Sequence, residues 1–140
     1  NKYLKLVYLW RNDKLVIKNS LSKKKISYEN HKLWIKNKLK VKSNRIFIFL
    51  KNEDPIGTCS IIKDKNYFYF NYLIEKNSRK KGYSKIMLKR FIERLKRLKI
   101  KQKIIAIVIK SNQLSFKLLS NLGFEFISRK DSYYILKLKT

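Results

Sequence analysis

The sequence predicts a single α+β domain in which helices flank a mixed, mostly antiparallel sheet. Residues 1–40 carry apolar residues at helical spacing, residues 45–75 contain three strand-like runs separated by turns, and residues 83–138 alternate helix and strand. The 140 residues include one proline and no repeat or linker-like stretch. We therefore expect residues 1–140 to form one domain.

The first segment fits two periods. Leu4, Val7 and Tyr8 share a helical face, whereas Leu4, Leu6, Tyr8 and Trp10 alternate as in a strand. We favour a helix.

The second helix has a clearer start. Ser27 can cap a helix that begins at Tyr28, and Glu29 would lie in the favourable first turn. Further along this helix, the side chains that share one face are His31, Trp34, Ile35 and Leu39.

The middle of the chain changes to strand-like composition. The runs "RIFIFLK", "IGTCSIIK" and "YFYFNYLIE" are rich in β-branched and aromatic residues. The turn sequences "NEDP", which contains Pro55, and "KDKN" separate them. These runs predict a three-stranded antiparallel meander over residues 45–75.

The last part alternates helix and strand. Leu88, Phe91, Ile92 and Leu95 define an amphipathic helix, and the apolar run "KIIAIVIK" predicts a strand covered on both faces. "QLSFKLLSNLG" predicts a short helix ended by Gly123. "FEFIS" and "SYYILKLK" are predicted to close the chain as strands.

The charge is strongly one-sided. Lys and Arg number 36 against 9 Asp and Glu, a formal net charge of +27, which attracts polyanions such as nucleic acid or nucleotide-type ligands. However, Lys, Ile, Asn and Tyr share A/T-rich codons, and the lysines are spread along the whole chain. Genome composition is therefore an equally simple source of the excess, and we consider nucleic-acid binding unlikely.

Composition also narrows the chemistry and the compartment. Cys59 is the only cysteine, so no intrachain disulfide is possible. One His and one Cys cannot form a plausible metal cluster, so we expect no metal. No apolar run is long enough to span a membrane, and we expect a cytoplasmic protein that does not bind membranes.

The stretch "NSRKKGYS" lies between the third meander strand and the following helix. The first turn of a helix has unpaired N–H groups and partial positive charge, which together form an anion site. Gly82 allows close approach, Ser84 can cap the helix, and Arg79, Lys80 and Lys81 would add charged contacts. These residues predict a phosphate-binding loop, with a solvated turn as the alternative.

From residue 45 onward the chain resembles the GCN5-related N-acetyltransferase (GNAT) superfamily. The resemblance rests on Arg79, Gly82 and Ser84 in the loop, on Asn112 at the next strand–helix turn, and on the "LGF" ending at Gly123. It implies a GNAT fold and acetyl-CoA as cosubstrate. The cofactor-binding residues it implies are Leu73, Ile74, Arg79, Lys80, Lys81, Gly82, Tyr83, Ser84, Asn112 and Ser115.

The resemblance also implies catalytic roles. The amine attacks the thioester directly, while an N–H near Leu73 or Ile74 polarises the carbonyl. Glu75 and His31 are the candidate bases, with an ion-pair partner and a helix-surface residue as their alternatives. Leu119 stands where the family often has a proton-donating Tyr, so water or another group must protonate the thiolate. The candidates are Tyr133 and Tyr134, of which we favour Tyr134.

The front half points to an acceptor. "LWRNDKLVIKNSL…ISYENHKLWIKNKL" looks like the 4-amino-sugar N-acetyltransferases of pseudaminic acid biosynthesis, which implies a nucleotide-linked amino sugar as acceptor. A ribosomal-protein-type N-terminal acetyltransferase and a non-enzymatic nucleic-acid-binding or degenerate CoA-binding domain are the alternatives. The family's first strand has no visible counterpart, and a homodimer stays open.

Overall fold

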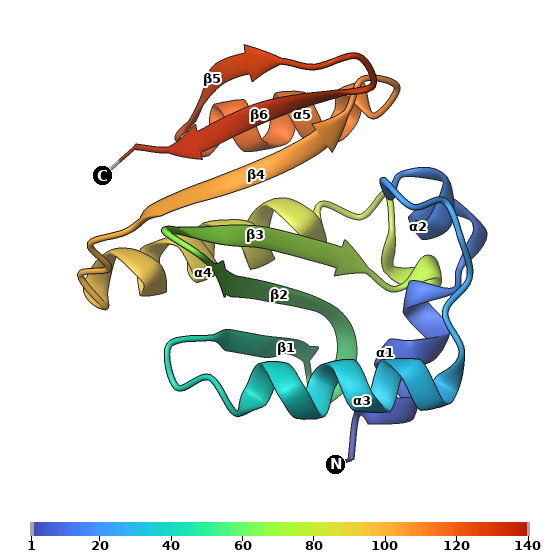
Figure 1. The fold of residues 1–140 in the computed structure, drawn as a ribbon. Coiled ribbons are helices and arrows are strands. Elements are labelled where there is room, and N and C mark those ends of the chain that lie inside the picture. The colour runs from blue at the N-terminus through green and yellow to red at the C-terminus, as the bar shows by residue number, and fades with distance from the viewer. Residues whose placement is uncertain (1, 140) are drawn as a thin grey trace.

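The computed structural model describes residues 2–139, which form one six-stranded sheet between two groups of helices (Figure 1). The strand order is β1-β2-β3-β4-β6-β5, and only the β3–β4 pair is parallel. In the view of Figure 1, α3 lies in front of the sheet while α4 and α5 lie behind it. The predicted mixed sheet with flanking helices is confirmed.

The N-terminal region is helical, as the sequence predicts. It comprises α1 (Leu4–Arg11), the short α2 (Lys14–Lys18) and α3 (Tyr28–Leu39). Ser27 caps α3 by accepting a hydrogen bond from the Asn30 N–H at 3.2 Å. Leu39, predicted to face inward, is 52% exposed. Ring contacts from α1 reach Tyr28, His31 and Trp34, so the last turn of α3 lies beyond this support.

The predicted meander is present as β1 (Arg45–Lys51), β2 (Asp54–Asp64) and β3 (Tyr67–Ile74). Its first turn is tighter than "NEDP" suggests. Asn52 and Glu53 both have positive φ, 48° and 74°, as in a two-residue hairpin turn. Pro55 already lies within β2, opposite Leu50, where the β1–β2 register shifts.

The remaining elements follow the predicted order. They are the single 3₁₀ turn η1 (Lys76–Ser78), α4 (Tyr83–Arg97), β4 (Lys103–Ile109), α5 (Gln113–Asn121), β5 (Phe124–Arg129) and β6 (Tyr133–Leu138). Gly123, with φ 107°, follows the end of α5 as predicted.

One core joins the two ends of the sheet. Phe70 of β3 packs against Phe91 of α4 and Phe124 of β5, with ring centroids 5.5 and 5.0 Å apart. The periodic residues of α4 are all buried, as predicted: Leu88, Phe91, Ile92 and Leu95. Burial of such side chains contributes about 1.5–3 kcal/mol each. Residues far apart in sequence are thereby held around α4.

The β3–β4 pair is short. Its register runs from Tyr67↔Lys103 to Tyr69↔Ile105, although β3 continues to Ile74 and β4 to Ile109. The two strands therefore diverge over their carboxyl-terminal halves, where backbone groups on the facing edges have no strand partner. This divergence lies next to the loop that leads into α4 (Figure 1).

Candidate functional site

The N-terminus of α4 has free backbone donors. Gly82 occupies the cap position with φ 79° and ψ 4°, no side chain caps the helix, and its first turn contains no acidic residue. The predicted capping role of Ser84 is wrong, because Ser84 lies inside the helix, two residues after the cap. The first N–H groups of α4 are thus available to an anion.

Space for that anion is present at Gly82. A Cβ built on Gly82 would meet no atom within 4 Å, so the cap faces open space. Lys80 also has positive φ, 61°, which curls the loop, and both Lys80 and Lys81 are exposed. The geometry fits a phosphate group held by backbone N–H groups and two flexible ammonium groups.

Arg79 is oriented differently from its neighbours. Its Nη2 donates to Asp13 Oδ2 at 2.9 Å, and its Nε donates to the Ile74 carbonyl at 3.1 Å. The sequence groups Arg79 with Lys80 and Lys81 as phosphate contacts. In the structure its guanidinium instead binds two protein oxygens.

The end of β3 presents one backbone N–H toward β4. The Glu75 N–H donates to Ile56 O in β2 at 2.8 Å. Backbone groups alternate along a strand, so Leu73 also faces β2, whereas Ile74 faces the divergence. The Ile74 carbonyl, which binds Arg79, has the same orientation. Of the two predicted oxyanion donors, the Ile74 N–H is therefore the one directed at the gap.

On the far side of the gap, Asn112 caps α5. Its side-chain oxygen accepts from the Ser115 N–H at 3.3 Å. The Ser115 hydroxyl accepts a hydrogen bond from Tyr72 of β3 at 2.7 Å, which links β3 to α5. Burial raises the pKa of Tyr72, so its hydroxyl remains protonated. In the sequence, Tyr72 shows only the alternation of its strand, which favours sheet packing over a contact in the site.

The two candidate bases lie in different places. Glu75 follows β3 directly, and its carboxylate accepts hydrogen bonds from the Asn77 N–H at 2.7 Å and the Ser78 hydroxyl at 2.8 Å. His31 is fully buried between α1 and α3 against Tyr8, and neither ring nitrogen has a hydrogen-bond partner. Burial and the Arg11 charge lower the pKa of His31. The structure does not bring the two residues together.

Two tyrosines of the predicted site contact other groups. Tyr134 of β6 packs edge-to-face against Phe116 and Phe126, with centroids 5.0 and 6.0 Å apart. Tyr83, the first residue of α4, hydrogen-bonds Lys51 at the end of β1. That contact lowers the pKa of Tyr83.

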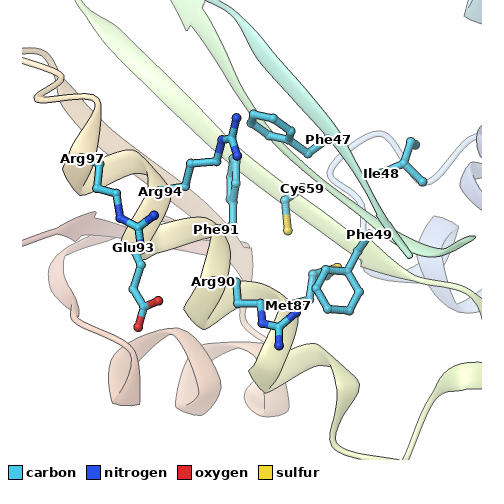
Figure 2. Close-up of a pocket in the computed structure, with 10 residues that line it drawn as sticks. All are labelled: Phe47, Ile48, Phe49, Cys59, Met87, Arg90, Phe91, Glu93, Arg94 and Arg97. Carbon is cyan, nitrogen blue, oxygen red and sulfur yellow. The ribbon is translucent and has the colours of Figure 1, made fainter. Parts of the chain in front are cut away.

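A groove of about 450 Å³ lies elsewhere, between β1 and α4 (Figure 2). Phe47 and Phe49 of β1, with Met87 and Phe91 of α4, form its apolar lining. Arginines of α4 border it, and the Arg94 guanidinium lies 4.8 Å from the Phe47 ring. None of its lining residues belongs to the phosphate loop or the strand divergence.

Two kinds of feature are absent from the part of the chain that the structure describes. Across residues 2–139, no group of three His, Cys, Asp or Glu side chains is arranged to hold a metal ion. No helix in this range has the length and apolar character needed to cross a bilayer.

Diverging parallel strands beside an open helix N-terminus form a site that fits a phosphate-bearing ligand. Comparison with known proteins shows the family to which the chain belongs. Residues 3–125 match the family described as an acetyltransferase (GNAT) domain. The chain belongs to this family and is an N-acetyltransferase with acetyl-CoA as cosubstrate. No curated protein sequence matches it significantly.

Solved structures agree on the fold. Campylobacter jejuni N-acetyltransferase PseH, in complex with acetyl coenzyme A, shares 22% identity at a TM-score of 0.74, covering 99% of this chain and 91% of that one. Ribosomal-protein-alanine N-acetyltransferase from Brucella melitensis shares 18% sequence identity at a TM-score of 0.77, and the match covers 97% of this chain and 92% of that one. Aminoglycoside acetyltransferase AAC(6′)-Ib in complex with coenzyme A shares 16% identity at a TM-score of 0.79, and the match covers 99% of this chain and 90% of that one.

Proposed function

We propose that this protein transfers the acetyl group of acetyl-CoA to the amino group of a nucleotide-linked amino sugar. The observation that carries the proposal is the meeting of the β3–β4 divergence with the uncapped N-terminus of α4. The divergence offers a free strand edge to the extended pantetheine arm of acetyl-CoA. The uncapped helix N-terminus offers N–H donors to the phosphates of the same molecule.

Different groups of the chain bind the pyrophosphate and polarise the thioester carbonyl. The first N–H groups of α4, with Lys80 and Lys81, bind the pyrophosphate. The Ile74 N–H, directed into the gap, donates to the carbonyl oxygen as negative charge develops on it. The thioester supplies an activated acetyl group, so the protein needs no covalent intermediate.

Glu75 is our candidate for the base that accepts the proton of the attacking amine, acting through a bridging water. It directly follows Ile74, and its carboxylate already accepts two hydrogen bonds. The replacement Glu75→Gln keeps one acceptor oxygen, which can still accept from the Asn77 N–H, and removes the basic charge. We expect a fall in kcat of about a hundredfold, the usual contribution of such a group. Unchanged kcat would exclude Glu75 as the base.

The proton for the leaving thiolate needs a second group. The sequence suggests Tyr134 as a candidate, and Tyr72 is a second hydroxyl, which lies between β3 and α5. Tyr72→Phe and Tyr134→Phe, compared at saturating substrate, distinguish them. The donor is the residue whose loss lowers kcat and alters the alkaline limb of the pH–rate profile.

The acceptor proposal rests on the front-half resemblance and on the net charge of +27. A nucleotide-linked acceptor carries phosphates, and a strongly positive protein attracts it and repels cationic amines. The second candidate is a peptide N-terminus, favoured by the fold shared with the Brucella ribosomal-protein-alanine enzyme.

Thermal unfolding tests the cosubstrate claim. Millimolar acetyl-CoA should raise Tm, because a ligand that binds only the folded state stabilises it. Gly82→Val should abolish the shift, since valine fills the open cap and is strained at φ 79°. Gly123→Val, also at positive φ but at the end of α5, is the matched control: it should lower Tm yet keep the shift. No shift for the unaltered protein would refute cosubstrate binding.

The acceptor is then tested by thiol release from acetyl-CoA. The panel contains UDP-4-amino sugars, N-terminal peptides, polyamines and an aminoglycoside. We expect turnover with the UDP-sugars alone. Turnover with peptides alone would replace the sugar assignment with the second candidate.

A further inference from the structure

We propose that Asp13 is a positioning residue for the phosphate loop: it holds the Arg79 guanidinium, which fixes the end of β3 relative to the start of the loop. This inference rests on the proposed function and adds a residue from the other end of the chain. It also assigns Arg79 to protein oxygens instead of to the pyrophosphate.

The Arg79 guanidinium donates two hydrogen bonds, each to a different residue. Nη2 donates to Asp13 Oδ2 at 2.9 Å, while Nε donates to Ile74 O at 3.1 Å. The planar guanidinium can satisfy two acceptors at fixed angles, which a lysine ammonium at the end of a flexible stem cannot reproduce. Arg79 therefore ties the strand end that carries the Ile74 N–H to Asp13.

Asp13 is itself held in place. Its carboxylate caps α2 by accepting from the Leu15 N–H at 3.1 Å. The preceding residue, Asn12, clamps the backbone of Ile26 by accepting from its N–H at 2.9 Å and donating to its carbonyl at 2.8 Å. The "WRND" segment thus serves as a fixed anchor, and Figure 1 shows α2 beside the loop that follows β3.

The Asp13–Arg79 pair differs from the other two ion pairs among the described residues. Its side chains are only 19% and 22% exposed and 2.9 Å apart, whereas Lys32–Glu29 and Lys137–Glu125 are longer, at 3.6 Å, and more exposed. Exposed single pairs contribute little, whereas a sheltered pair with good geometry can order the groups it joins. Partial burial raises the pKa of Asp13, but the hydrogen bond from Arg79 and its positive charge together lower this pKa by more. The net shift is downward, so the carboxylate stays ionised.

Two roles for Arg79 make opposite predictions. If Asp13 competes with the pyrophosphate for Arg79, then Asp13→Asn weakens the attraction of the guanidinium to residue 13 and tightens CoA binding. If Asp13 positions the loop, the same change weakens binding. Asn caps helices as well as Asp does, so the cap of α2 survives and only the charge is lost.

The test measures Kd for CoA by calorimetry well below Tm, at several salt concentrations. We expect Asp13→Asn to weaken binding about tenfold. The slope of log Kd against log salt should stay unchanged, because the phosphate-contacting charges remain. Arg79→Lys should show a similar loss, and the double variant should be no worse than either single one.

Ser27→Ala is the matched control, since it removes the cap of a helix outside the site. It should lower Tm without changing Kd, which separates positioning from a general loss of stability. Tighter CoA binding in Asp13→Asn, an unchanged Kd, or additive losses in the double variant would each overturn the proposal.

Hydrogen exchange without ligand separates this inference from the proposed function. In Asp13→Asn the amides of residues 79–82 should exchange faster, while those of α3 keep their rates. Faster exchange supports positioning even if the unaltered protein fails to bind CoA, and unchanged rates overturn it. Failure of CoA to bind the unaltered protein would refute the proposed function alone.

Discussion

The N-termini of α3 and α4 are built in opposite ways. At α3, Ser27 accepts from the Asn30 N–H and Glu29 places negative charge in the first turn. At α4, the cap is Gly82, no side chain accepts from the helix, and the first turn has no acid. Both helices have the same unpaired donors and the same dipole.

The difference separates stability from function. The Ser27 cap accepts from one of the unpaired N–H groups of α3, whereas no side chain caps α4 and its first N–H groups are open to a ligand.

The largest effect is expected from giving α4 the acid that α3 has. Ser84→Asp should weaken CoA binding at least tenfold, because the carboxylate competes with the pyrophosphate for the same N–H groups. The same change should stabilise the ligand-free protein by about 0.3–1 kcal/mol through the helix dipole.

Calorimetric titration and urea unfolding measure these two opposite changes. Ser84→Asn, which adds size without charge, is the control and should bind CoA nearly as the parent does. Equal CoA affinity in Ser84→Asp would show that the phosphates bind elsewhere.

The next effect concerns the interior of α3, where His31 is buried. The folded-state pKa of His31 lies below the unfolded value of about 6.5, so unfolding binds a proton as pH falls below that value. Stability should be fully present above pH 6.5 and decline below it. The charge that acts on His31 is that of Arg11, which is constant in this range.

Tm measured between pH 7.5 and 5 checks this decline. His31 is the only histidine of the chain, so His31→Phe should flatten the profile. A flat profile in the unaltered protein would contradict the prediction.

The smallest effect is expected from removing the α3 cap. Ser27→Ala should cost about 1 kcal/mol of unfolding free energy. It should leave the CoA affinity unchanged, as measured by the same titration and unfolding experiments. A loss of CoA affinity would show that the two termini are coupled and would remove the contrast between them.

Much of the fold was predictable because local patterns decide it. The periodic residues of α4, the Ser27 cap and the strand runs each reflect contacts within a few residues. The position of Gly82 at the start of α4 was predictable for the same reason, since the glycine and the helix start are adjacent in sequence. The phosphate-binding role of this loop stays a prediction.

Other parts of the site depend on contacts between distant residues. The Asp13–Arg79 bond joins positions 66 apart, and the Tyr72–Ser115 bond joins positions 43 apart. Asp13 is an acid that precedes a short apolar run, and this local pattern indicates a helix cap. The pattern does not indicate that Arg79 is the partner of Asp13. The orientation of Ile74 toward the gap required the sheet register, which strand composition does not provide.

The short β3–β4 pairing has a consequence for motion. Three residue pairs join the β1–β3 half of the sheet to the β4–β6 half, while each half has longer ladders of its own. A small rotation about Tyr69 and Ile105 would change the width of the gap by bending, without unpairing either half. Such a rotation would also act on the Tyr72–Ser115 hydrogen bond, which spans the two halves, so this bond would limit how far the gap can widen.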